Sequence, residues 1–221
     1  MNKTDVVLLR HMVVSAMLLG LFAVIGTALV AVTYDATAER IAANHRARLL
    51  RSLHLLITPD QHDNDLFTDV TTVTDRELLG TDEPVKVYRA RKNGQPVAAI
   101  INSVAPDGYS GRIDLLVAIR YDGTLAGVRV INHKETPGLG DGIEITRSDW
   151  IRSFDNRSLH NPDRKGWAVK RDGGIFDQFS GATISPRAVV KAVYRTLLYF
   201  DKHRDELFAK PSVPIEGKPH A

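Results

Sequence analysis

A threonine that follows a run of small residues offers a hydroxyl nucleophile near the start of a helix. The segment Asp177–Thr183 reads Asp-Gln-Phe-Ser-Gly-Ala-Thr, and a helical pattern follows it at once. The small residues Gly181 and Ala182 allow a bulky group to approach the backbone closely. Amides at a helix N-terminus donate to anions, so a phosphate on Thr183 would lie in a favourable field. A tight turn that leads into a helix explains the same residues, so their types alone leave both interpretations open.

The sequence contains no residue pattern typical of a catalytic site that acts on a substrate. An unperturbed hydroxyl is a weak nucleophile, so Thr183 needs an activating base or a metal to form a phosphoester. The eight histidines are dispersed and form no His-Glu-x-x-His motif, which predicts no metal site. There is no Gly-x-Ser-x-Gly elbow, and Ser180 lacks an evident histidine partner. We therefore expect no catalytic acid, base or metal ligand in this chain.

The composition limits the remaining classes of function. The chain has no cysteine, which excludes disulfides, thiolate nucleophiles and cysteinyl iron–sulfur clusters. Any electrons that the protein carries must therefore reside on a bound cofactor. The net charge is only +3 and the basic residues are scattered, whereas nucleic-acid binding usually needs a clustered basic surface. No nucleic-acid partner is expected.

A second glycine-rich segment, His133–Asp141, follows a predicted strand and reads His-Lys-Glu-Thr-Pro-Gly-Leu-Gly-Asp. A dinucleotide-binding loop is one interpretation. The full Gly-x-Gly-x-x-Gly spacing is missing, however, and the segment lies between predicted antiparallel hairpins, which disfavours that interpretation. A glycine-rich turn remains an alternative for Gly140 and Gly142 individually.

Together the two segments resemble the FMN-binding domains of the Rnf/Rsx electron transport complexes and of sodium-translocating NADH:quinone reductases. The motifs are Asp-x-x-Ser-Gly-Ala-Thr at 177–183 and Glu-Thr-Pro-Gly-Leu-Gly at 135–140. Their order after one N-terminal anchor, and the segments 134–140 and 148–150, resemble the Rnf/Rsx G subunit more than the quinone-reductase C subunit. The similarity extends from the anchor to the last helix, but within 60–83 we recognise no motif.

The resemblance implies a role for each matching residue. Thr183 would carry FMN through a phosphoester, attached by a separate magnesium-dependent flavin transferase that uses FAD. Thr136 would hydrogen-bond the cofactor, and Leu139 would pack on its ring. The recognition positions around the acceptor would be Asp177, Ser180, Gly181 and Ala182.

The implied function is electron transfer within a larger complex. The family couples ferredoxin–NAD electron transfer to ion movement, so the chain would be a redox subunit with other membrane subunits as partners, not a stand-alone enzyme. Two alternatives stay open. One is a C-type subunit of a sodium-translocating NADH:quinone reductase, and the other is a non-redox anchored module for binding or assembly.

The elements that must position these segments form an α+β domain. Two hairpins are predicted by alternating apolar residues around short turns, 85–91 with 96–104 and 113–121 with 125–132. A short helix is expected from a Ser148 cap to Phe154, and a strand over 167–170. Ser185 is expected to cap a last helix that begins at Pro186 and runs to about residue 201. Strands followed by a terminal helix indicate one FMN-binding domain over 60–205 with an antiparallel sheet and flanking helices.

The N-terminal part predicts a membrane anchor. Residues 12–33 contain no charge and are long enough to cross a bilayer as a helix. A cleaved signal peptide is the alternative, since Ala36–Ala38 resembles a cleavage site. Residues 1–11 would be a short cytoplasmic N-terminus, 34–59 a helical stalk or a membrane-surface helix, and 206–221 a disordered tail.

The charges beside the anchor do not establish its orientation. Lys3 and Arg10 precede the span, while four arginines follow it within about twenty residues, so the positive-inside count is ambiguous. The resemblance implies a single-pass protein of the inner membrane whose soluble domain lies on the periplasmic side.

Overall fold

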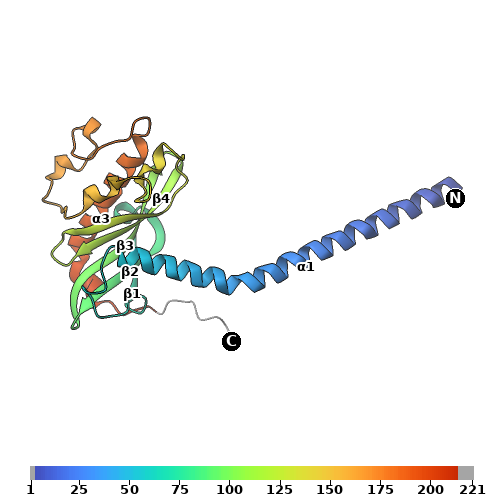
Figure 1. The fold of residues 1–221 in the computed structure, drawn as a ribbon, viewed down its shortest axis with the longest axis horizontal. Coiled ribbons are helices and arrows are strands. Elements are labelled where there is room, and N and C mark those ends of the chain that lie inside the picture. Colours follow the sequence, from blue (N-terminus) through green and yellow to red (C-terminus); the bar gives the residue numbers. More distant parts are fainter. Residues whose placement is uncertain (1–2, 214–221) are drawn as a thin grey trace. The chain divides into compact units, whose positions relative to one another are not determined.

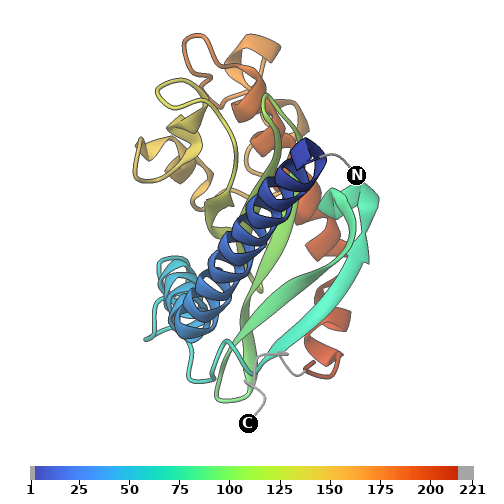
Figure 2. The ribbon, with the colours of Figure 1, turned by 90° about the vertical axis from the view of Figure 1, so that its right-hand side faces the viewer.

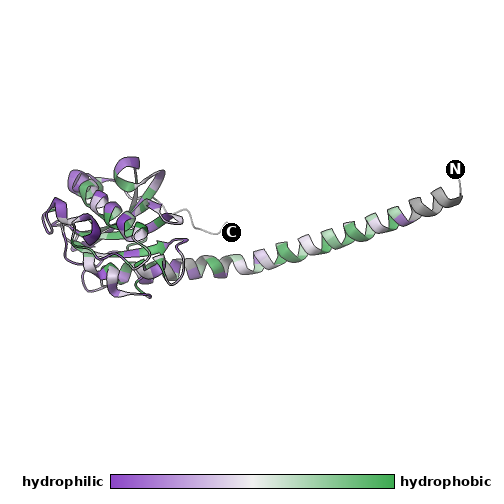
Figure 3. Cartoon of the chain, turned by 90° about the horizontal axis from the view of Figure 1, so that it is seen from above, coloured by the Kyte–Doolittle hydropathy of each residue, from purple (hydrophilic) through white to green (hydrophobic). Residues whose placement is uncertain are grey.

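The computed structural model describes residues 3–213 and divides the chain between Arg51 and Ser52 into two compact units. Helix α1 (Lys3–His54) makes up nearly all of the described part of the first unit (Figure 1). Its segment His11–Ala38 is long and apolar enough to cross a membrane, and none of it is buried inside the protein (Figure 3). The expected anchor and residues 34–54 of the expected stalk are thus one continuous helix, which fits a single-pass anchor, while residues 55–59 are not helical.

The second unit is built on a five-stranded antiparallel sheet with the order β1-β2-β3-β4-β5. Both predicted hairpins are confirmed, β2 with β3 and β4 with β5. Asn93 and Gly94 turn the first hairpin with positive φ angles of 52° and 75°, the backbone that an Asn-Gly pair adopts readily. β1 lies in the segment where we recognised no motif. The strands are β1 (Val70–Asp75), β2 (Thr81–Lys92), β3 (Gln95–Gly108), β4 (Gly111–Arg120) and β5 (Leu125–Asn132).

Helix α3 (Ile184–Ala209) packs on one face of this sheet (Figure 2). Apolar side chains of neighbouring strands form a buried row toward it: Val87, Ile101, Val117 and Val128. Val189 and Val193 of α3 belong to the same core, as the apolar spacing of that helix predicts. This packing makes α3 the rigid support for whatever lies at its first turn.

The opposite face of the sheet is covered by residues that precede β1. Alternation along the strands turns Tyr88 and Ile100 away from α3. Leu53 and Ile57 are fully buried, and Phe67 packs edge-on against Tyr88 with ring centroids 6.4 Å apart. The compact unit therefore begins at Ser52, before the expected domain start at residue 60.

Short helices replace regular strands between β5 and α3. These are η1 (Gly140–Ile143), η2 (Asp149–Phe154), η3 (Arg164–Gly166) and η4 (Lys170–Asp172). One more short helix, α2 (Arg76–Leu79), lies between β1 and β2. The Ser148 cap is confirmed, because its hydroxyl oxygen accepts from the Trp150 amide. The expected strand at 167–170 is wrong. Only an isolated bridge joins Val169 to Phe176, since the segment folds around an aromatic cluster of Phe154, Trp167 and Phe176.

The end of α3 also differs from the prediction. The helix continues to Ala209, and Leu207 and Phe208 are buried in the core. The chain then runs along β1, where the Val213 amide donates to the Val70 carbonyl at 2.7 Å. Residues 206–213 are therefore part of the folded domain, while the rest of the expected tail, 214–221, lies outside the described residues. The whole is an α+β domain behind one N-terminal apolar helix, as predicted.

Candidate functional site

Thr183 occupies the N-cap position of α3, and its hydroxyl is not used to cap the helix. Its backbone is already helical, with φ −81° and ψ −28°, whereas a residue that caps through its side chain usually has an extended backbone. The side chain is half-buried. Thr183 therefore places a hydroxyl that does not cap the helix at the start of α3.

The expected cap at Ser185 is wrong, because the helix begins two residues earlier than predicted. Ser185 is the second helical residue, is fully buried, and donates its hydroxyl to Glu135 at 2.5 Å. Pro186 is third in the helix, where its missing amide hydrogen costs nothing because the first four amides lack helical partners.

The first turn of α3 leaves two backbone donors free beside Thr183. Within residues 3–213 the amides of Ile184 and Ser185 have no hydrogen-bond partner, and Pro186 has no amide hydrogen. The Arg187 amide already donates to the Thr183 carbonyl at 3.2 Å. Two unpaired donors together with the helix dipole favour an anion at this position.

A tight turn brings Ser180 and Gly181 to the surface just before Thr183. The Ala182 amide donates to the Phe179 carbonyl at 3.1 Å, and Gly181 has a φ of +79°. A side chain at this left-handed position would strain the backbone. A Cβ added to Gly181 would lie 3.6 Å from Cδ2 of Leu139, so the two segments singled out in the sequence lie next to each other.

Hydrogen bonds within residues 136–141 fix the conformation of the loop that carries Leu139. The Thr136 carbonyl accepts from the amides of Leu139 and Gly140, both at 3.1 Å. The buried carboxylate of Asp141 accepts from the Gly138 amide at 2.8 Å. As a result Thr136 is exposed and Leu139 keeps 48% of its surface exposed. The loop therefore keeps an exposed leucine next to Gly181, two residues before Thr183.

Asp177 lies at the edge of this arrangement. Its carboxylate pairs with Lys170 at 2.6 Å, and its carbonyl accepts from the Trp150 indole at 2.7 Å. The Trp150 ring in turn packs edge-on against Phe179, with ring centroids 5.4 Å apart. Asp177 and Trp150 therefore fix the chain on the way to Ser180, and the side chain of Asp177 points to Lys170.

Comparisons with known proteins match two regions of the chain to family models and most of it to named relatives. Residues 108–198 match the FMN-binding domain and residues 1–56 match the RnfG N-terminal region. The G subunit of the ion-translocating oxidoreductase complex of Shewanella loihica is 48% identical over 203 residues, covering 92% of this chain and 96% of that protein. Its counterpart from Pseudomonas aeruginosa (strain PAO1) is 50% identical over 200 residues, covering 90% and 94%. The chain belongs to the G-subunit family of ion-translocating oxidoreductase complexes.

A solved structure is also similar to this member of the G-subunit family. It is the C subunit of the Na(+)-translocating NADH-quinone reductase from Parabacteroides distasonis. It has 20% identity and a TM-score of 0.48, and the match covers 66% of this chain and 80% of that one.

In this chain, the match to the FMN-binding domain runs from the end of β3 into α3. It therefore includes both Thr183 and the loop with Leu139.

Lys170 was not among the candidate site residues that the sequence indicated. Lys170 and Asp177 flank the turn Asp172-Gly173-Gly174, and that turn is the signal that could have paired them. The hydrogen bond from the Trp150 indole to the backbone of Asp177 was not anticipated either, because it joins residues 27 positions apart and has no local sequence signature.

A hydrogen bond between His133 and Glu144 closes the base of the Thr136–Leu139 loop. Nε2 of His133 lies 2.5 Å from the carboxylate of Glu144. This hydrogen bond is the main reason why the pKa of Glu144 lies below its ordinary value of 4.5, and the Thr146 hydroxyl contributes further. A carboxyl with a lowered folded pKa stabilises the fold above its unfolded pKa, and that contribution is lost as the pH falls through the folded value.

We therefore predict that the loop is destabilised by acid. In the parent protein, NMR titration of the Glu144 side chain should give a pKa below 4.5, and the amides of the loop should exchange faster once that group is protonated. In His133→Phe, whose side chain has no hydrogen-bond donor, the Glu144 pKa should rise toward its ordinary value. Equal Glu144 titrations in the two proteins would contradict this prediction.

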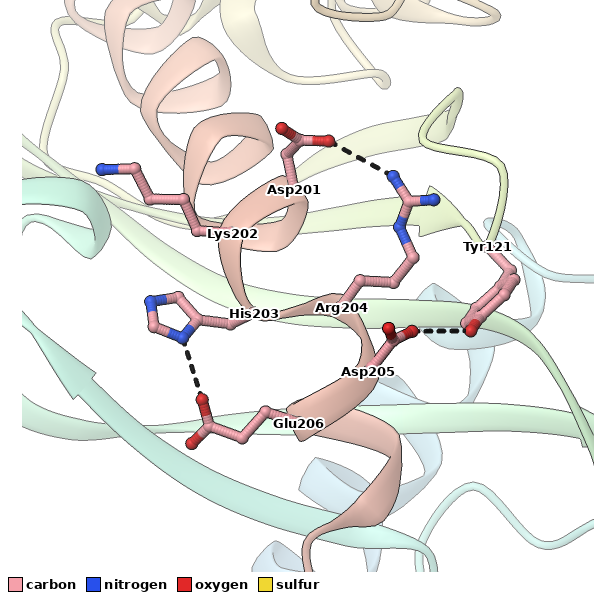
Figure 4. Close-up of a pocket in the computed structure, with 7 residues that line it drawn as sticks. All are labelled: Tyr121, Asp201, Lys202, His203, Arg204, Asp205 and Glu206. Carbon is pink, nitrogen blue, oxygen red and sulfur yellow. Dashed lines mark hydrogen bonds and ion pairs between the residues drawn. The ribbon is translucent and has the colours of Figure 1, made fainter.

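A shallow hollow at the other end of α3 is unrelated to this site (Figure 4). It is lined by Tyr121 and residues 201–206. Its carboxylates are paired locally: Tyr121 donates to Asp205 at 2.8 Å and His203 lies 3.0 Å from Glu206. Asp201 follows Thr183 by 18 residues, which is roughly 27 Å along a helix. The hollow is too far from Thr183 to belong to the same site.

Proposed function

We propose that this chain carries FMN covalently on Thr183 and transfers electrons as a membrane subunit of an ion-translocating oxidoreductase complex. One observation carries the proposal: the Thr183 hydroxyl makes no capping hydrogen bond and lies beside the unpaired amides of Ile184 and Ser185. A phosphate ester fits there, since the two amides and the helix dipole would stabilise its negative charge. The match to the FMN-binding domain supports FMN as the cofactor.

The neighbouring residues would receive the rest of the cofactor. Gly181 and Ala182 leave the backbone accessible, and Ser180 is exposed beside them. Leu139 and Ile184, which keep 48% and 44% of their surfaces exposed, would support the apolar ring, and Thr136 would hydrogen-bond its polar edge. Asp177 would assist recognition by the transferase or hold Lys170 near the flavin phosphate.

The attachment step follows from the chemistry of the hydroxyl. Oγ1 of Thr183 attacks the FMN phosphorus of FAD, so that an oxygen–phosphorus bond forms and the pyrophosphate bond breaks. AMP leaves, and the hydroxyl proton passes to a base. We assign that base and the magnesium ion to a separate flavin transferase, because an unperturbed threonine hydroxyl needs activation.

The chain's own part in turnover is to hold the cofactor in place. The flavin supplies the redox chemistry when bound, and the protein supplies position and electrostatics. A covalent link would prevent loss of the cofactor outside the cytoplasm. We place the domain on the periplasmic side of the inner membrane, with other membrane subunits as partners in ferredoxin–NAD electron transfer. The apolar helix α1 supports a membrane anchor, and the names of the relatives support a complex with further subunits.

The decisive experiment is mass analysis of the full-length protein. Purified in detergent after coexpression with a flavin transferase, it should gain the mass of one FMN less water, and peptide mapping should locate the adduct at Thr183. Protein made without the transferase is the control and should lack the adduct. An unmodified protein under both conditions would favour a non-redox anchored module.

A C-type subunit of a sodium-translocating NADH:quinone reductase would give the same adduct. The 48–50% identity to G subunits over most of the chain favours the G-type complex. Identification of the membrane subunits that copurify with the tagged, flavinylated protein distinguishes the two. Copurification of quinone-reductase subunits would contradict our assignment.

A further inference from the structure

A buried glutamate links the first turn of α3 to two other segments. Glu135 keeps only 4% of its surface exposed. One carboxylate oxygen, Oε1, accepts from the Ser110 amide at 3.0 Å, and the other, Oε2, accepts from the Ser185 hydroxyl at 2.5 Å. Ser110 lies in the turn between β3 and β4, so three segments that are distant in the sequence meet at one side chain.

The surroundings of Glu135 leave its carboxylate little room to move. A Cβ on Gly108 would lie 2.8 Å from Oε1, and a Cβ on Gly140 would lie 2.8 Å from Oε2. Both glycines thus bring the backbone against the carboxylate. Close packing of this kind transmits a displacement instead of absorbing it.

The link to Ser185 defines how α3 meets the Thr136–Leu139 loop. Ser185 follows Thr183 by two residues in the first turn, and Glu135 directly precedes Thr136. A hydrogen bond that involves a charged group is stronger and shorter than a neutral one. The Ser185 hydroxyl therefore holds the first turn, which directly follows Thr183, against the loop.

We propose that Glu135 is a positioning residue for flavin attachment, acting through Ser185 on the orientation of Thr183. The inference rests on the proposed function, because it concerns the rate at which Oγ1 of Thr183 forms its bond to phosphorus with release of AMP. That reaction needs the oxygen in line with the bond that breaks, and a small misplacement of a reacting group slows such reactions strongly.

The test is a single-turnover measurement of flavin attachment to full-length protein in detergent. Purified flavin transferase and saturating FAD are mixed with the parent protein, Ser185→Ala or Ser185→Thr. Ser185→Ala should lower the maximal attachment rate by about tenfold or more, with no change in the protein concentration that gives half the maximal rate. Ser185→Thr keeps the hydroxyl and should recover most of the rate.

Ser103→Ala is the matched control. Ser103 is also buried and also bonds α3, accepting from the Thr196 hydroxyl at 2.7 Å. Thr196 lies 13 residues after Thr183, roughly 20 Å along the helix. The control removes a comparable buried hydrogen bond and should leave the attachment rate unchanged.

Each outcome has a defined meaning. A parent rate in Ser185→Ala, or an equal loss in Ser103→Ala, would overturn the positioning role. If Ser185→Ala does not fold, Glu135→Gln replaces it, since it keeps the side-chain shape, and a parent rate in that variant would also overturn the role. A parent protein that is never labelled would overturn the proposed function itself, whereas equal labelling of parent and variant leaves that function intact.

Discussion

Thr183→Ala is expected to abolish covalent flavin attachment completely. The substitution removes the oxygen that forms the phosphoester, and alanine offers no replacement. The fold should remain intact, because the Thr183 side chain is half-buried and makes no capping hydrogen bond. We expect its free energy of unfolding to change by less than about 0.5 kcal/mol, as for substitutions away from buried networks. Intact-mass analysis and flavin fluorescence of the denatured protein on a gel measure the loss.

Two further variants make the result specific to Thr183. Thr183→Ser retains a hydroxyl and should still be labelled, but more slowly, because serine lacks the branched carbon that restricts the side-chain rotamer. Thr72→Ala removes the same atoms from an exposed residue of β1 and should be labelled like the parent protein. Flavin that stays covalently bound in Thr183→Ala would show that the acceptor is another residue.

Arg89→Met is expected to destabilise the folded domain by about 3 kcal/mol. Arg89 keeps only 2% of its surface exposed and pairs with Asp69. It also donates to the Leu207 carbonyl at 2.9 Å and to the Ser212 hydroxyl at 2.8 Å. Methionine keeps much of the volume but leaves these acceptors without their cation, and an unpaired buried acceptor costs free energy. Urea unfolding of the full-length protein, followed by tryptophan fluorescence, measures the change.

Arg112→Met is the control for the loss of a surface ion pair. Arg112 pairs with Asp114 and Glu83, but its side chain is 50% exposed. Exposed pairs contribute between zero and about 1 kcal/mol, so the unfolding midpoint should shift little. An equal effect of the two substitutions would show that the contacts of Arg89 with residues 207–212 do not hold the end of α3 on the sheet.

Much of the fold follows from local patterns. Asn93-Gly94 predicts its hairpin because the dipeptide accepts the positive φ angles that the turn needs. The apolar spacing of Val189, Val193 and Leu197 predicts the face of α3 that packs on the sheet. The proposal of Thr183 as the acceptor rests on the family resemblance of seven consecutive residues and on the helix after them. Each of these inferences depends on residues that are neighbours along the chain.

Other features have causes that lie far apart in the sequence. β1 is a strand because it pairs with β2, and the segment 167–170 is not one because its aromatic residues enter a cluster with Phe154. The helix α3 begins at Ile184 and not at the predicted Pro186. Ser185 bonds Glu135, fifty residues away, instead of capping the helix.

The candidate site likewise combines features that are local in the sequence with contacts between residues that are far apart in it. The residues 177–183 carry the family resemblance from which Thr183 is proposed as the acceptor, and they place a hydroxyl next to small residues and a helix start, which is a local property. The approach of Leu139 to Gly181 and the link from Glu135 to Ser185 arise only when the loops fold onto α3. Buried polar groups must find partners wherever the chain brings them, and a local pattern carries no information about partners so distant.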